Sequence, residues 1–237
     1  MKNIKQFIKT LSGATLLFLT STSFADGIEQ TTQSYTDLNI VGDFEQNERL
    51  KWLLYTEGVW NIDNPNNSNV FDNAMFRGGL GYAIAPNLTF WAAYSFIVDN
   101  PESSNNEYEN RLHEQLTWVI GDLADITFVS SSRIEQRLYS ESSEVALRYR
   151  QTLQAVFPSF SQYNLTPVVF DEVYIPINHP NWVDSSTISE NDIFAGIEIP
   201  TSEDTAFTVG YMNQYNFDAG GENSMNHIIY FIFDIAA

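Results

Sequence analysis

Hydrophobic and polar residues alternate with a period of two along most of this chain. Between residues 88 and 98 one face is apolar and the other is mixed, and the same alternation recurs over residues 126–138, 145–157 and 192–199. Because successive side chains of a strand point to opposite faces of its sheet, this period predicts strands with two different faces. No stretch shows a comparable 3.6-residue period, so we expect almost no helix.

The alternating runs are long for strands. Many reach 11 to 17 residues, whereas strands in soluble folds usually have about 5–6 and a tilted strand needs about 9–11 to cross a bilayer. Their length therefore favours a transmembrane β-barrel over a soluble sandwich. The candidate strands lie near residues 36–46, 48–60, 74–84, 88–98, 108–120, 124–140, 143–157, 162–178, 190–199, 204–216 and 224–235.

The connections support the same class of fold. Long polar connections and tight turns largely alternate, as they do when a barrel has long loops on one side of a membrane and short turns on the other. The exception is a short connection at residues 140–143, where a long one is due. The long connections are residues 62–73, 99–107, 179–189 and 217–223.

Parity then bears on the number of strands. Eleven candidate strands cannot return the C-terminus to the periplasm while the long loops stay outside, and bacterial single-chain barrels have even strand counts. We therefore expect an all-β, antiparallel, up-and-down barrel of about 12 strands, with residues 27–35 supplying the additional one. The alternative is a barrel of about 10 strands with an N-terminal segment in or under it.

Residues 1–25 have the features of a secretory signal peptide. Lys2, Lys5 and Lys9 form a basic region, residues 11–19 are apolar, and the small residues Ser23 and Ala25 predict cleavage before Asp26. We expect residues 26–237 to form one barrel domain in a bacterial outer membrane. Its partners would then be membrane lipid and the machinery that inserts barrels.

Composition excludes several classes of function. The chain has a net charge of −19, and without residues 1–25 it keeps 8 basic against 30 acidic residues. A nucleic-acid partner is excluded on this ground, because phosphate binding needs a basic surface. The absence of cysteine removes thiol nucleophiles, thiolate zinc sites and disulfides. The acidic loop at residues 99–109 lacks the spacing of a calcium loop, so we expect neither a metal nor a cofactor.

Charged side chains alternate on two neighbouring predicted strands, 124–140 and 143–157. If the connection at 140–143 pairs these strands, Glu135 lies opposite Arg148 or Arg150. An arginine that faces lipid at the midplane costs about 2–4 kcal/mol, so we expect these residues to face the lumen. The candidate lumen residues are Arg133, Glu135, Arg137, Arg148, Arg150 and, on the next strand, Glu172.

This charged ladder has two interpretations. It is either a salt-bridged network that stiffens a narrow barrel, or an electropositive constriction that attracts a small anionic solute. An enzyme is not expected, because His113, His179 and His227 do not match the pattern of a known outer-membrane lipase. The functional hypotheses are thus a narrow pore or small-solute binder, a structural or surface-interaction barrel without transport, and last a lipid-acting hydrolase or acyltransferase.

Several short motifs, taken in order, resemble one bacterial family. They are Arg77-Gly-Gly-Leu-Gly-Tyr, Arg133-Ile-Glu-Gln-Arg-Leu, Ala146-Leu-Arg-Tyr-Arg, Asp171-Glu-Val-Tyr, Ala195-Gly-Ile, Gly210-Tyr-Met-Asn-Gln-Tyr and Asn226-His227. The chain resembles the outer-membrane proteins of domain-of-unknown-function family 2490. That resemblance implies a membrane barrel and no established activity. One departure concerns the chain end, where Phe233 is followed by Asp234-Ile-Ala-Ala237 in place of a terminal aromatic residue, so we expect less efficient insertion or an internal signal.

Overall fold

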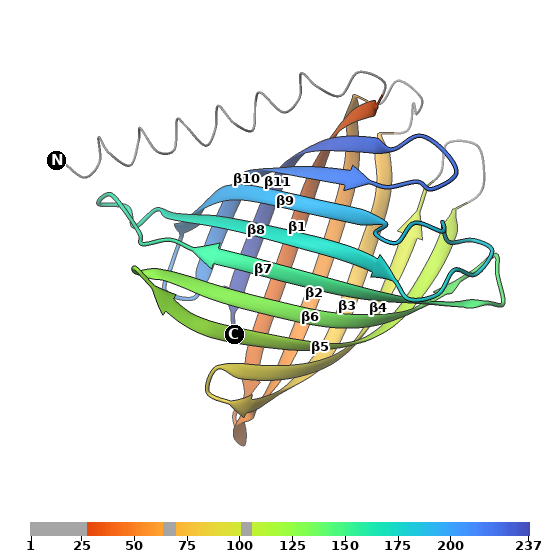
Figure 1. Ribbon diagram of the computed structural model, residues 1–237. Coiled ribbons are helices and arrows are strands. Elements are labelled where there is room, and N and C mark those ends of the chain that lie inside the picture. The colour runs from red at the N-terminus through yellow and green to blue at the C-terminus, as the bar shows by residue number, and fades with distance from the viewer. Residues whose placement is uncertain (1–27, 64–69, 101–105) are drawn as a thin grey trace.

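A computed structural model describes residues 28–63, 70–100 and 106–237 of the chain (Figure 1). The signal peptide predicted for residues 1–25 lies outside this described part. Within it the chain is all-β, as predicted, and no helix there is long and apolar enough to cross a bilayer.

The described residues form 11 strands. Nearly all of them match the alternating runs of the sequence to within a few residues, because the period-two pattern continues until a turn interrupts it. The strands are β1 (Glu29–Phe44), β2 (Asn47–Asp63), β3 (Phe71–Ala85), β4 (Leu88–Asp99), β5 (Glu107–Leu123), β6 (Ile126–Tyr139), β7 (Val145–Val156), β8 (Thr166–Pro176), β9 (Glu190–Pro200), β10 (Thr205–Asn216) and β11 (Ser224–Ala236).

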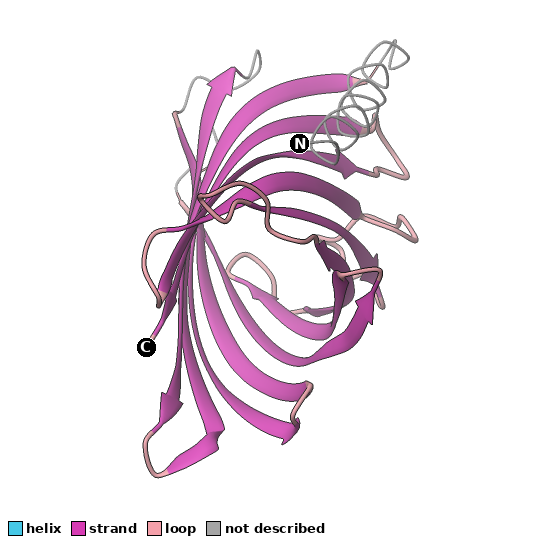
Figure 2. Cartoon of the chain, turned by 90° about the vertical axis from the view of Figure 1, so that its left-hand side faces the viewer, coloured by secondary structure: helices cyan, strands magenta, loops and turns pink. Residues whose placement is uncertain are grey.

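The strands close into a barrel in which each strand pairs with its neighbours in sequence (Figure 2). Every pair is antiparallel except the closing one, where β1 and β11 run parallel over 13 residue pairs, from Glu29–Ser224 to Val41–Ala236. Both the expected count of 12 and the alternative of 10 are therefore wrong. The parity argument assumed antiparallel closure, and a parallel seam closes an odd number of strands without an additional one.

The same seam explains the N-terminal region. Residues 29–35 are not a separate strand or a plug, because they continue directly into residues 36–44 as β1. β1 thus begins at the end of the barrel that carries the long connections, and it has the same direction as β11. The connection between β6 and β7 is also at this end and is as short as the sequence predicted.

The two faces of the barrel wall differ sharply in polarity. Large apolar side chains point outward, and Leu54, Phe76 and Leu80 are 54%, 56% and 61% exposed. Inward positions carry buried charged and polar groups together with one apolar cluster of Phe194, Met212, Ile228 and Tyr230. Glycine makes room for this cluster, since a Cβ at Gly210 would lie 2.5 Å from the Phe194 ring.

Candidate functional site

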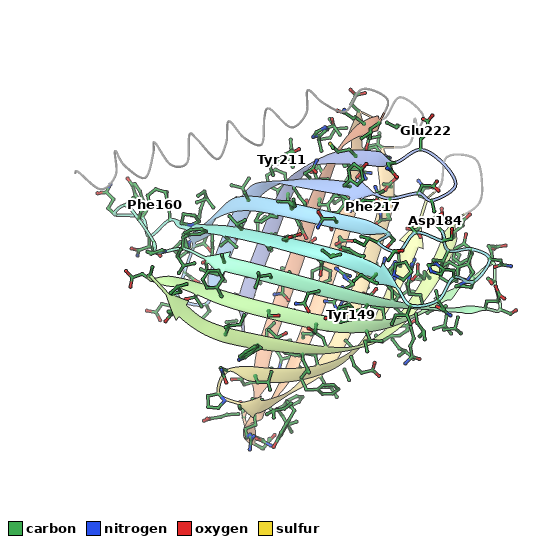
Figure 3. The ribbon with its side chains drawn as sticks, viewed as in Figure 1. Tyr149, Phe160, Asp184, Tyr211, Phe217 and Glu222 are labelled. Carbon is green, nitrogen blue, oxygen red and sulfur yellow. The ribbon has the colours of Figure 1, made fainter. Side chains whose placement is uncertain are left out.

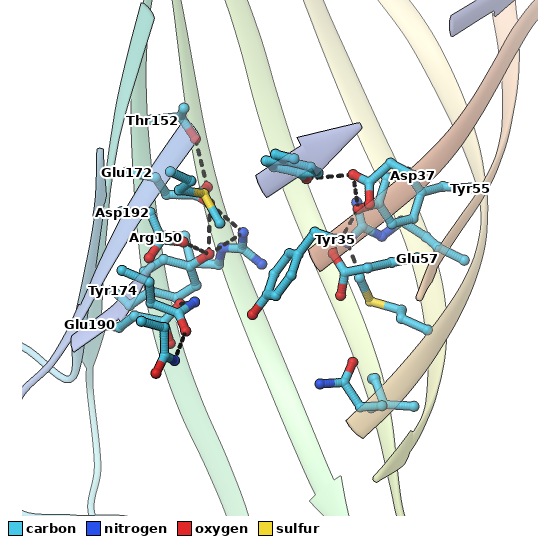
Figure 4. Close-up of a pocket in the computed structure, with 18 of the residues that line it drawn as sticks. Tyr35, Asp37, Tyr55, Glu57, Arg150, Thr152, Glu172, Tyr174, Glu190 and Asp192 are labelled. Atoms are coloured by element: carbon cyan, nitrogen blue, oxygen red, sulfur yellow. Dashed lines mark hydrogen bonds and ion pairs between the residues drawn. The ribbon is translucent and has the colours of Figure 1, made fainter. Parts of the chain in front are cut away.

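The barrel encloses a cavity of about 550 Å³, to which every strand contributes at least one side chain. Most lining residues come from the middles of the strands and from the ends that carry the long connections, and Gln154 lies toward the opposite end of β7. Asp184, Phe217 and Glu222 mark that end of the molecule, and Phe160 marks the opposite end (Figure 3). The volume is in the range of small-molecule sites. This cavity is the candidate site (Figure 4).

The hairpin of β6 and β7 brings its charged residues together inside the barrel. Glu135 pairs in register with Arg148 and Arg133 with Arg150. Glu135 is 1% exposed and accepts hydrogen bonds from Arg148 Nε and Nη2 at 2.9 and 2.6 Å, and from Arg150 Nη1 at 3.0 Å. Arg133 Nη1 lies farther away, at 3.4 Å. One carboxylate therefore serves three guanidinium groups.

Glu172 on β8 extends this network, as the sequence predicted for the next strand. Arg150 Nη2 donates to Glu172 Oε2 at 2.5 Å and to the Tyr174 hydroxyl at 2.8 Å. Thr152 Oγ1 donates to the other carboxylate oxygen of Glu172 at 2.7 Å. Arg150 thus bridges Glu135 and Glu172 across three strands.

Arg137 also faces the lumen, but its partner lies on β5. Its Nε and Nη2 donate to Glu109 at 2.7 and 2.8 Å, and Arg111 donates to the same carboxylate at 2.5 and 3.1 Å. The sequence analysis assigned Glu109 to an acidic loop and left Arg111 unassigned. Glu109 and Arg111 alternate with Asn110 within β5, and this period of two would have indicated both as inward residues.

Two further pairs of carboxylates, missed by the sequence analysis, line the lumen. Asp37 of β1 and Glu57 of β2 face each other in register, and Glu190 and Asp192 stand on β9. The hydroxyl groups of Tyr55 and Tyr230 each lie 2.5 Å from Asp37 Oδ2. These acids are dispersed along the sequence, so only closure of the barrel brings them to one cavity.

The histidines are placed differently from one another. His113 faces inward opposite Glu135, while His227 lies with Tyr211 on the outer face and His179 lies in the connection between β8 and β9. Within residues 28–63, 70–100 and 106–237, no three histidine or carboxylate groups are close enough together to hold a metal ion.

The long connection between β8 and β9 packs against residues near the end of β6. Its Trp182 ring stacks on Tyr139 at 5.2 Å between centroids and lies 5.1 Å from the Arg137 guanidinium carbon. Asp184 ties this connection to residues 217–223, because its Oδ1 accepts a hydrogen bond from the Ala219 amide nitrogen at 3.1 Å. Hydrogen bonds from the Ser186 hydroxyl and from the Ala219 amide hold the pKa of Asp184 well below its usual range.

These features define the class of protein as an 11-stranded closed β-barrel with a charged internal cavity. The chain belongs to the family described as "Protein of unknown function (DUF2490)", whose model matches residues 32–226. It is similar to an uncharacterised protein of Methylorubrum extorquens, with 23% identity over 165 residues that cover 69% of this chain and 72% of the relative. No solved structure matches the chain.

Proposed function

We propose that this protein is an outer-membrane barrel whose lumen binds or passes a small polar solute. The observation that carries the proposal is the internal cavity of about 550 Å³, which is lined by charged and hydrogen-bonding side chains from all the strands. A barrel that served only as a scaffold would be expected to fill this space with side chains, as small barrels do.

Two observations support a membrane location. The strands have 11 to 17 residues, enough to cross a bilayer with a tilt. Large apolar side chains such as Leu80 and Phe76 point outward, where lipid would cover them, and the network of arginines and glutamates points inward. The basic side of the lumen, with Arg111, Arg133 and Arg150, would meet an anionic group of the solute.

Reconstitution of the full chain into liposomes tests both the membrane location and the function of the lumen. We expect the folded barrel to insert, to migrate differently in gels before and after boiling, and to admit solutes that protein-free liposomes exclude. The residues 153 and 154 offer a matched pair of variants, because Gln154 lines the cavity while Leu153 points outward and is 48% exposed.

Gln154→Trp is expected to lower solute entry or binding several-fold, since the indole would occupy cavity volume. Leu153→Trp should leave both unchanged, because its ring would lie on the outer face. A barrel that inserts, yet neither binds nor admits any small solute, would overturn the lumen function in favour of a structural or surface role. A chain that stays a water-soluble monomer without detergent would overturn the membrane location.

A further inference from the structure

The charges of the lumen are separated into two sides. All the ion pairs between arginine and glutamate in the described chain fall on strands β5 to β8, where five arginines share three glutamates. This basic side therefore carries a net excess of two positive charges. Its members are Arg111, Arg133, Arg137, Arg148 and Arg150 with Glu109, Glu135 and Glu172.

The acidic side consists of Asp37 and Glu57, on β1 and β2, while Glu190 and Asp192 on β9 lie next to β8 of the basic side. None of these four carboxylates forms an ion pair with any residue that the structure describes. In the order of strands around the barrel, β1 and β2 lie opposite β6 and β7, whereas β9 is the direct neighbour of β8. Asp37 and Glu57 therefore face the basic side across the cavity, while Glu190 and Asp192 lie beside Arg150 and Glu172 (Figure 4).

The hydrogen-bond donors that contact these carboxylates are uncharged, so they do not neutralise the carboxylate charge. Tyrosine hydroxyls contact Asp37 at 2.5 Å and Asp192 at 3.1 Å, and the Gln214 amide donates to Glu190 at 3.1 Å. Asp37 and Asp192 are each 3% exposed, and the Oδ1 atom of each has no hydrogen-bond partner in the described structure. A buried carboxylate without a counter-charge is costly, and a cationic ligand or a bound proton would remove that cost.

The chemical class of a cationic ligand at this position can be narrowed. The described residues hold no cluster of three metal-ligating groups, which argues for an organic ammonium group over a metal ion. Arg77, on β3 beside the acidic side, forms no ion pair with a described residue and lies 4.5 Å from the Tyr55 ring. The ion pair of Arg133 on the basic side is 3.4 Å long. Arg77 and Arg133 are thus the cavity-lining guanidinium groups with the weakest carboxylate contacts.

We propose that the cavity binds a small zwitterion, with its ammonium group against Asp37 and Glu57 and its carboxylate against Arg77 and Arg133. This inference rests on the proposed function of the lumen and specifies the class of its solute. A purely anionic solute would satisfy the arginines and leave the acidic side unpaired. A zwitterion with both charges separated by a short chain would satisfy both sides at once.

Short alanine peptides provide probes that differ only in end charge. Alanine, dialanine and trialanine are zwitterions at neutral pH, their N-acetyl forms are anions, and their C-terminal amides are cations. Titration calorimetry on the barrel folded in detergent measures binding of each. We expect at least one uncapped compound to bind about tenfold or more tightly than both of its capped forms, a preference that corresponds to about 1.4 kcal/mol or more.

Variants of the four proposed contact residues show which charged end of the ligand each residue binds. Asp37→Asn and Glu57→Gln should weaken binding of the zwitterion about tenfold and leave the N-acetyl form unchanged. Arg77→Gln and Arg133→Gln should weaken the zwitterion and the N-acetyl form, and leave the amide unchanged. Asp171→Asn is the matched control, because Asp171 is exposed on the outer side of β8. Heat-modified migration in gels verifies that each variant is folded.

The outcomes separate this inference from the proposed function. If the N-acetyl forms bind as tightly as the uncapped compounds, the zwitterion is overturned and the solute is an anion, while the lumen function stands. If the amides bind as tightly, the solute is a cation, with the same consequence. If no probe binds and the liposomes admit no solute, the proposed function itself falls.

Discussion

Glu135 is the residue on which the basic side of the lumen depends. It is 1% exposed and forms ion pairs with Arg133, Arg148 and Arg150. Arg148 has no other carboxylate partner among the described residues, whereas Arg150 also reaches Glu172. Removing one partner of a buried ion pair leaves the others uncompensated, which is more damaging than never having placed charges there.

We predict that Glu135→Gln lowers the free energy of unfolding by about 3–5 kcal/mol. Urea titration of the barrel in detergent, followed by gel migration without boiling, measures this quantity. Glu203→Gln, in the exposed turn between β9 and β10, is the control and should change stability little. A loss as small as that of the control would mean that water in the lumen solvates the arginines after the carboxylate is removed.

At the scale of elements, two of the long connections at one end of the barrel are hydrogen-bonded to each other. Asp184, between β8 and β9, accepts a hydrogen bond from the amide of Ala219, which lies in the connection between β10 and β11. Ser186 of the first connection donates to the carbonyl oxygen of Phe217 in the second at 3.1 Å. Together these contacts fix two loops beside the cavity mouth.

We predict that Asp184→Ala loosens these loops and increases cleavage after the exposed Glu222 by a glutamate-specific protease several-fold. Mass spectrometry of the fragments identifies the site. The matched control is Asp204→Ala, at the opposite end of the barrel, which should leave cleavage after Glu222 unchanged. Equal cleavage in the two variants would show that Asp184 does not hold the loops.

The same contact has a defined dependence on pH. A carboxyl whose pKa is lowered by folding contributes stability above its unfolded pKa of about 3.9, and the contribution is lost as the pH falls through the folded value. Because the pKa of Asp184 is lowered by its hydrogen bonds from Ser186 and Ala219, the tie should persist throughout neutral and mildly acidic conditions. The ratio of cleavage rates between variant and parent protein should therefore stay constant from about pH 8 to about pH 5.

At the scale of the whole molecule, the parallel seam between β1 and β11 decides the strand number. Ser34 pairs with Ile229 across the seam, and Ile229 pairs in turn with Tyr211 on β10. All three positions alternate with inward residues and lie on the outer face. The chain has no cysteine, so introduced pairs report on these distances without interference.

We predict that Ser34→Cys with Ile229→Cys forms a crosslink under mild oxidation, because adjacent strands lie about 4.8 Å apart. Ser34→Cys with Tyr211→Cys should not, since a strand separates these positions. Gel migration under non-reducing conditions measures the product. Crosslinking of neither pair would place another element between β1 and β11 and would contradict the 11-stranded barrel.

Much of the local structure could be predicted from the sequence. Period-two alternation placed most strands within a few residues of their observed bounds, because each run ends where a turn breaks the pattern. Alternation also predicted the inward direction of Glu135 and Arg148, since a charged position between apolar ones identifies the lumen face. Family membership followed from motifs that are themselves strand segments.

Closure and the site depended on tertiary structure. Whether β1 pairs parallel or antiparallel with β11 depends on contacts between residues nearly 200 positions apart, and no local pattern encodes their direction. The pairing of Arg137 with Glu109 and the meeting of Asp37 with Glu57 likewise follow from register between strands. By itself the sequence determined which residues form strands and which face each one presents, because both depend on neighbours along the chain. Only the closed barrel decided which charges share one cavity, because that depends on the order, direction and register of all the strands together.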